Sequence, residues 1–163
     1  TTNVPGAKNF DTMKTYHNMM ERFRYGGLSV PGLYIDETVM RMCYTHRRLF
    51  ATLALHLIAE GHKDLAKKAL AKAMKEIPTY NVPMNYMSGG ADLAKAYALL
   101  GDKTNAMKCI NAVYGNAKEY VDYYLSLQGI RFQQSANDIM VQFSIMNQTA
   151  EVTKLVNAGL ARK

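Results

Sequence analysis

The feature that most constrains this sequence is a motif that occurs twice, forty residues apart. Each copy places a large apolar residue, a glycine, an alanine and a further apolar residue at the same spacing: Leu57, Gly61, Ala66 and Leu70 in the first copy, and Tyr97, Gly101, Ala106 and Ile110 in the second. Internal periods of this length are typical of stacked helix pairs. We therefore predict an all-α, tetratricopeptide-like stack of antiparallel helical hairpins, wound as a right-handed superhelix of about seven or eight helices.

Composition predicts that one domain covers residues 1–163, because 48% of the residues are hydrophobic and only four are proline. A chain of this length buries enough surface to fold without a disulfide or a metal. Along the chain we expect an N-terminal helix and connector (1–35), a first hairpin (36–78), an inserted loop (79–90), a second hairpin (91–115), and C-terminal helices with a cap (116–163).

Helix boundaries follow from capping residues. Asp11 and Asp36 precede apolar residues at helical spacing, so each is predicted to be an N-cap. The helix after Asp36 should run to about Glu60, and its partner should follow Gly61 and end at Pro78. The predicted inner stripe of the longer helix is Val39, Cys43, His46, Phe50, Leu53 and Leu57.

The C-terminal third is expected to hold several shorter helices. The last helix of the second hairpin should end near Gly115, with separate helices over Glu119–Leu127 and Ser135–Met146. Thr149 is predicted to cap a final helix that covers the end of the stack, with its apolar face formed by Val152, Leu155, Val156 and Leu160.

No motif for catalysis, a cofactor or a metal is present. His46, His56 and His62 are ten and six residues apart, so they do not meet on one helical turn as zinc ligands would. His46 is predicted to be a hydrogen-bonded core residue and the other two histidines to be exposed. Cys43 and Cys109 lie at apolar helical positions, so we expect buried thiols rather than a disulfide.

The net charge of +7 favours an anionic neighbour such as a membrane surface, an acidic protein or nucleic acid. Lys67, Lys68, Lys72 and Lys75 fall on one predicted helix, and solvated lysines on an exposed face explain them equally well. No aromatic residues are interleaved with these lysines, which disfavours nucleic acid as a partner.

Six short blocks, in order, carry a resemblance to one family. They are residues 11–20 (DTMKTYHNMM), 23–27 (FRYGG), 31–42 (PGLYIDETVMRM), 45–47 (THR), 58–61 (IAEG) and 80–83 (YNVP). This series resembles the C-terminal soluble part of large bacterial multi-pass membrane proteins, which are grouped with the protein O-mannosyltransferase-like glycosyltransferases. The likeness covers about residues 9–127.

The resemblance implies a domain tethered beyond the last membrane span, on the extracytoplasmic (periplasmic) side of the inner membrane; the cytoplasm is the alternative. The catalytic carboxylate of that family belongs to the membrane part, so we expect this chain not to be an enzyme. The chain starts at Thr1 without an initiator methionine, and we expect it to be a piece of a longer protein.

The function predicted on this basis is a non-catalytic accessory module that binds a protein or glycan ligand and its own membrane domain. The residues expected to contact the ligand are Tyr25, Tyr34, Arg41, Tyr80, Asn81 and Tyr86. A free-standing scaffold or adaptor that binds an acidic partner or nucleic acid through its basic face is the alternative. A third reading is a structural cap that stabilises the membrane domain.

Overall fold

The computed structural model describes residues 10–158, and every regular element in this part of the chain is helical. The elements are α1 (Thr12–His17), the π-helical turn η1 (Asn18–Arg22), α2 (Glu37–Ala59), α3 (Lys63–Glu76), α4 (Gly90–Leu99), α5 (Lys103–Ser126), α6 (Gly129–Gln134) and α7 (Ala136–Ala158). The predicted all-α class is confirmed for these residues. Residues 1–9 of the predicted N-terminal segment, and Leu160 of the predicted cap, lie outside the described range.

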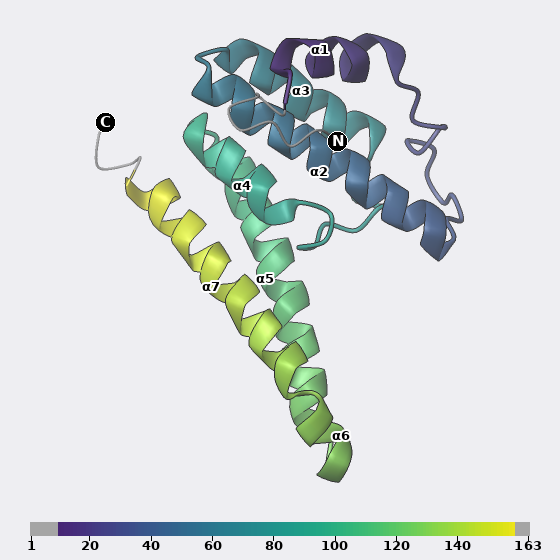
Figure 1. Ribbon diagram of the computed structural model, residues 1–163, viewed down its shortest axis with the longest axis vertical. Helices are drawn as coiled ribbons and strands as arrows, with labels where there is room; N and C mark the ends of the chain where they lie inside the picture. Colours follow the sequence, from purple (N-terminus) through teal and green to yellow (C-terminus); the bar gives the residue numbers. More distant parts are fainter. Residues whose placement is uncertain (1–9, 159–163) are drawn as a thin grey trace, which may run out of the picture.

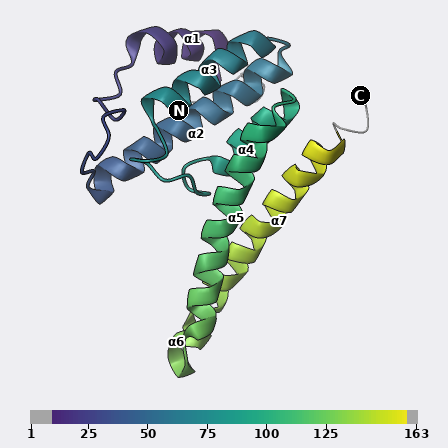
Figure 2. The ribbon, with the colours of Figure 1, turned by 180° about the vertical axis from the view of Figure 1, so that it is seen from behind.

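The helices form two hairpins and a long terminal helix (Figures 1 and 2). Helix α2 packs against α3, α4 packs against α5, and α7 runs back along both α5 and α4. The far halves of α5 and α7 project away from the other helices and are joined at their tip by α6. We call residues 113–146 the distal hairpin and residues 10–112 the body.

The repeated motif corresponds to the same turn in both hairpins. Gly61 and Gly101 adopt positive φ values of 86° and 79°, which suit glycine because it lacks a Cβ. The amide after each glycine then bonds back to the repeated large residue: His62 N–H to the Leu57 carbonyl at 2.7 Å, and Asp102 N–H to the Tyr97 carbonyl at 2.9 Å. The forty-residue period therefore reflects two equivalent helix ends.

The predicted N-caps at Asp11 and Asp36 are confirmed. A carboxylate oxygen of Asp36 accepts hydrogen bonds from the backbone N–H groups of Thr38 and Val39 at 2.8 and 3.0 Å, and Asp11 accepts one from Lys14 N–H at 2.9 Å. These bonds satisfy donors that the first turn of a helix leaves without partners.

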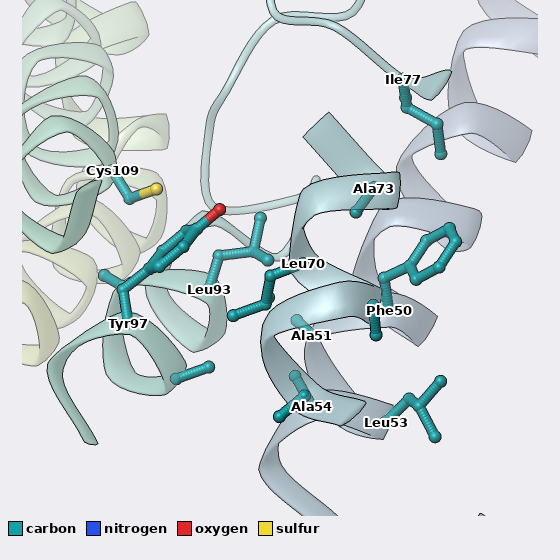
Figure 3. Close-up of a cluster of buried hydrophobic side chains, with 14 of the residues drawn as sticks. Phe50, Ala51, Leu53, Ala54, Leu70, Ala73, Ile77, Leu93, Tyr97 and Cys109 are labelled. Atoms are coloured by element: carbon teal, nitrogen blue, oxygen red, sulfur yellow. The ribbon is translucent and has the colours of Figure 1, made fainter. Parts of the chain in front are cut away.

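The core of the body lies where α2, α3 and α4 meet (Figure 3). Phe50 and Leu53 of α2 and Leu93 of α4 are fully buried there, and alanines such as Ala54 and Ala73 let the helix backbones approach closely. The predicted stripe on α2 is buried at Cys43, Phe50, Leu53 and Leu57, whereas His46 is half-buried and Val39 is exposed.

Helix α5 corrects one sequence prediction. It runs through Gly115 to Ser126, so the helix expected to end near Gly115 and the one expected over Glu119–Leu127 are a single element. Glycine inside a helix costs only about 1 kcal/mol relative to alanine. Burial of Val113, Ala117 and Val121 on either side of Gly115 outweighs that cost.

Helix α7 corrects a second prediction, because it continues without a break from Ala136 to Ala158. Thr149 is therefore not an N-cap. Its side chain is buried and its hydroxyl donates to the Met146 carbonyl three residues earlier, at 2.7 Å. Threonine in mid-helix commonly makes such a bond to the preceding turn.

Candidate binding groove

A hollow opens beside the face of α2 that packs in the core, and three of its lining residues, Ile35, Met40 and Tyr44, also pack against that core. Its walls are the first half of α2, the loop before α4, and one side chain from the distal hairpin, and its volume is about 910 Å³. The residues that form it are Ile35, Glu37, Met40, Arg41, Tyr44, Thr45, Arg48, Asn85, Met87 and Tyr120. We call this hollow the groove.

Arg47 holds the start of the loop before α4 in place through hydrogen bonds. This side chain is completely buried, and its guanidinium donates to the carbonyls of Ile77, Val82 and Pro83 at 2.8, 2.7 and 2.9 Å. The Nε atom has no hydrogen-bond partner among the described residues. Burial lowers the pKa of Arg47 to about 10, because the charged form is poorly solvated. Arg47 therefore ties residues 77–83 to α2.

The end of the same loop is fixed by small residues and a local network. Ser88 N–H donates to Asn85 Oδ1 at 2.8 Å, and Asn85 N–H donates to Ser88 Oγ at 3.0 Å. A Cβ on Gly89 would lie 2.9 Å from Arg48 Cα, and one on Gly90 would lie 2.5 Å from Val113 Cγ2. These glycines therefore allow the loop to contact both α2 and α5.

The polar groups of the groove are mainly hydrogen-bond donors. Arg41 donates to Glu37 at 2.6 Å on the groove surface, whereas Arg48 is exposed and makes no ion pair with any of residues 10–158. Asn85 Nδ2 donates to Tyr44 Oη at 3.2 Å, and the Tyr44 hydroxyl has no acceptor of its own among the described residues. Met40, Met87 and Tyr120 supply apolar surface beside these donors.

The groove continues past Arg48 and Met87 into a smaller hollow of about 110 Å³. Tyr86, Asp92 and Gln148 line this extension, so it reaches α4 and α7. The two hollows share Arg48 and Met87 in their linings.

The six residues predicted to contact a ligand do not form one site. Arg41 lies in the groove and Tyr86 in its extension. Tyr80 and Asn81 instead join the loop to the connector: the Tyr80 hydroxyl donates to the Ser29 carbonyl at 2.6 Å, and Asn81 Nδ2 donates to the carbonyls of Leu28 and Val30 at 2.7 and 2.6 Å.

Tyr25 and Tyr34 lie at a separate pocket of about 280 Å³ between the connector and the start of α2. Tyr25 is buried, and its hydroxyl donates to the Met19 carbonyl at 3.0 Å. Burial, followed by the negative charge of Glu76, raises the pKa of Tyr25 to about 12. Tyr34 is 89% exposed at the pocket rim, so of these two tyrosines it is the one with a free surface.

Sequence reasoning missed most of the groove, namely Tyr44, Arg48, Asn85, Met87 and Tyr120. One signal was present: Arg41, Tyr44 and Arg48 are three and four residues apart, which places them on one face of a helix. The contributions of the loop and of α5 come from distant parts of the chain and carry no local pattern.

The basic helix α3 is largely exposed, as expected for solvated lysines. Lys63, Lys67, Lys68 and Lys75 face solvent. Lys72 is different, because its Nζ donates to the Met20 carbonyl at 3.0 Å and lies 5.9 Å from the centre of the Tyr25 ring. This lysine holds the N-terminal helices against α3.

The histidines and cysteines of the described range gather into no metal site. Half-buried His46 has no hydrogen-bond partner at Nδ1 within residues 10–158, which differs from the hydrogen-bonded core histidine expected from sequence. Aromatic rings take the place of polar partners: Phe23 and Tyr25 meet the His46 ring edge to face at 6.1 and 6.0 Å.

Cys43 and Cys109 are buried free thiols, as predicted. Burial raises the pKa of both, that of Cys109 to about 11. Both thiols therefore stay protonated, and unreactive as nucleophiles, near neutral pH.

Two further findings bear on identity. Within residues 10–158 no helix has the length and apolar composition needed to cross a bilayer. No protein family, curated protein or solved structure matches this chain.

Proposed function

We propose that this domain is a non-catalytic module that binds a segment of a partner protein in the groove. The observation that carries the proposal is Arg48, an exposed cation without an ion pair in the described chain, which lines the same groove as Tyr44 and the apolar surfaces of Met87 and Tyr120. A segment that combines carboxylates with apolar side chains complements this arrangement.

The rigidity of the groove supports binding of a flexible segment. The three Arg47 hydrogen bonds and the close packing of Gly89 and Gly90 hold the loop wall in place before any ligand arrives. A preformed site loses less conformational entropy on binding, so more of the contact energy remains as affinity.

We further propose that the module is the soluble part of a multi-pass membrane glycosyltransferase-like protein on the extracytoplasmic side. The resemblance of the six sequence blocks supports this proposal. Reading the gene upstream of Thr1 tests it, because an in-frame region with many apolar spans is expected there. A start codon or a cleavable signal immediately upstream would remove the support. In the first case, acceptor glycans and the membrane part itself are the next ligands to test.

The groove itself is tested with a labelled peptide. The probe is a fluorescein-labelled Leu-Glu-Glu-Phe-Asp-Glu-Leu-Glu, followed by fluorescence anisotropy, and the control peptide has every carboxylate replaced by its amide. We expect Arg48→Ser to weaken binding of the acidic peptide by about tenfold, the loss of one charge-assisted contact of ~1.4 kcal/mol. Binding of the amide peptide should be weak for both proteins.

A double variant, Lys67→Ser with Lys68→Ser, distinguishes binding at the basic face of α3 from binding in the groove. If the groove is the site, this variant binds within about twofold of the wild type at 150 mM salt, because neither lysine lines the groove and the long-range attraction of exposed charges is largely screened. A larger loss from the α3 variant than from Arg48→Ser would overturn the groove and favour the adaptor function. No binding of the acidic peptide by the wild type would also contradict the proposal.

A further inference from the structure

Helix α7 carries two apolar stripes rather than one. The first consists of Ile145, Thr149, Val152 and Val156, which are buried against α5 and α4. The second begins on α6 and has successive spacings of 4, 3, 4, 3 and 4: Phe132, Ala136, Ile139, Phe143, Met146 and Ala150. This is the a/d spacing of a coiled-coil seam. We call these six residues the outer seam.

The outer seam is continuous across the junction between the two helices. Ser135 lies between them in a helical conformation, its N–H bonds to the Arg131 carbonyl at 3.2 Å, and its carbonyl accepts from Ile139 N–H at 3.0 Å. The helical phase therefore carries Phe132 onto the same face as Ala136 and Ile139.

Much of the outer seam faces solvent. Phe132 and Phe143 are 42% and 45% exposed, Ala136 and Ala150 are exposed, and only Ile139 and Met146 are half-buried. Helix α7 lies at the edge of the molecule in both views (Figures 1 and 2). A helix with two apolar stripes is suited to pack between two neighbours. The described chain covers the first stripe, but it covers the outer seam only in part, where Met146 packs against the small core of Val113, Ala117 and Ile145.

The residue sizes along the outer seam are complementary to those of a second seam that runs in the opposite direction. If two seams run antiparallel with their midpoints at residue 141, Phe132 meets Ala150 of the second copy, Ala136 meets its Met146, and Ile139 meets its Phe143. Two of the three layers then pair a large residue with a small one, which fills space evenly. A parallel pair would set alanine against alanine and leave cavities.

The charge pattern also favours a second copy. The whole chain carries +7, so identical copies repel each other over most of their surface. Residues 139–150 (IMVQFSIMNQTA) contain no charged side chain, and the seam is flanked by the amides Gln133, Gln142 and Asn147. An acidic protein or an anionic lipid surface would require positive charges here, and the seam has none to offer.

We propose that two copies of this chain associate through the outer seam, with their α6–α7 segments antiparallel about a two-fold axis near residue 141. Such an interface is isologous, so each contact occurs twice. Six residues per copy are far fewer than the roughly 20 to 30 of a standard specific interface. We therefore expect a weak dimer, with a dissociation constant of roughly ten to a hundred micromolar.

Disulfide trapping tests the antiparallel register. In the double variant Ala136→Cys/Met146→Cys, the two cysteines of one chain are ten residues apart, or about 15 Å, too far for an internal bond. The antiparallel dimer places each beside the other cysteine of the second copy, so mild oxidation should yield a covalent dimer. Neither single variant should be trapped, because its cysteine lies about 15 Å from the same residue in the second copy. Trapping of the single variants would indicate a parallel pair and overturn the proposed register.

Sedimentation equilibrium tests the interface itself, over about 1 to 300 µM, the range in which interfaces of this size dissociate. Phe143→Glu should raise the dimer dissociation constant by about thirtyfold, the effect of a hot-spot residue. Val141→Glu is the matched control: Val141 is 53% exposed and lies two residues away on the opposite side of α7, so association should stay within about twofold.

Circular dichroism of both variants confirms that α7 remains folded. A wild-type chain that stays monomeric up to 300 µM contradicts the proposal. So does a monomer whose outer seam mediates binding to vesicles of phosphatidylcholine and phosphatidylglycerol, because the seam would then be a lipid-binding surface.

Discussion

The body and the distal hairpin are both built from helices, but the helices of the two regions are packed very differently. In the body, Phe50, Leu53 and Leu93 are fully buried where three helices meet. In the distal hairpin only two helices meet, and its separate small core consists of Val113, Ala117 and Ile145. Where three helices meet, the side chains between them are shielded from water on all sides. Most of the distal hairpin has no third helix against it in the described chain, so we expect it to unfold locally more readily than the body.

The largest effect is expected from one truncation in each region. Phe50→Ala should lower the free energy of unfolding by about 4 kcal/mol, because it leaves a large cavity in a fully packed core. Ile145→Ala should cost about 2 kcal/mol, since its 7% exposed site can relax toward solvent. Urea unfolding followed by circular dichroism measures both. Equal losses would show that the two cores are equally tight.

Arg47 provides the next test, because it fixes the loop that the body presents to the groove. Arg47→Met should cost about 3 kcal/mol, since the buried hydrogen bonds to the carbonyls of Ile77 and Val82 and the part-buried one to Pro83 are lost. Arg48→Met changes the neighbouring, exposed arginine in the same way and should alter the free energy of unfolding by less than about 0.5 kcal/mol. Similar losses in the two variants would mean that the buried hydrogen bonds contribute little.

Alkaline pH tests the packing of the body at Cys109, which lies close to the start of the distal hairpin. Burial raises its pKa from 9 to about 11, so the folded state favours the protonated thiol. The resulting stability is fully present below pH 9 and is lost as pH rises toward 11. We expect a loss of about 1 kcal/mol between pH 8 and 10.

The matching control is Cys109→Ala, measured by urea unfolding at the same two pH values. Its pH dependence should be flatter than that of the wild type over this interval. If the variant loses as much stability between pH 8 and 10 as the wild type, then groups other than Cys109 cause the loss. Tyr25 and Tyr97 are two such groups, because burial raises the pKa of each to about 12.

The smallest expected effect is a gain in stability at the junction of the two regions. Gly115 lies inside α5, and a Cβ added there meets nothing within 4 Å. Gly115→Ala should therefore stabilise the chain by about 0.5 to 1 kcal/mol. Gly101→Ala is the opposite case, because φ there is +79° and the added Cβ is strained. Slower amide exchange in α5 and α7 would show that the gain reaches the distal hairpin.

Much of the fold could be predicted from the sequence because it depends on neighbours along the chain. The caps at Asp11 and Asp36 and the glycine turns at Gly61 and Gly101 are local hydrogen-bond patterns, and each was identified from residue type and spacing. The right-handed superhelical sense stays a prediction.

The candidate groove was predicted only in part. Arg41 and Tyr86 were identified, but Tyr80 and Asn81 bond to the connector, and Tyr25 is buried in a different part of the molecule. Their roles depend on which distant backbone carbonyls come within reach, and sequence spacing carries no information about that.

By itself, the sequence determined the helical class, the positions of the turns and the heptad spacing of the outer seam, because each depends on residues a few positions apart. Only the tertiary structure decided that α5 continues through Gly115, that α7 continues through Thr149, and that Arg47 rather than Arg48 is buried. In each case the outcome depends on the energy of packing against a remote helix or loop, which exceeds the local preference of the residue.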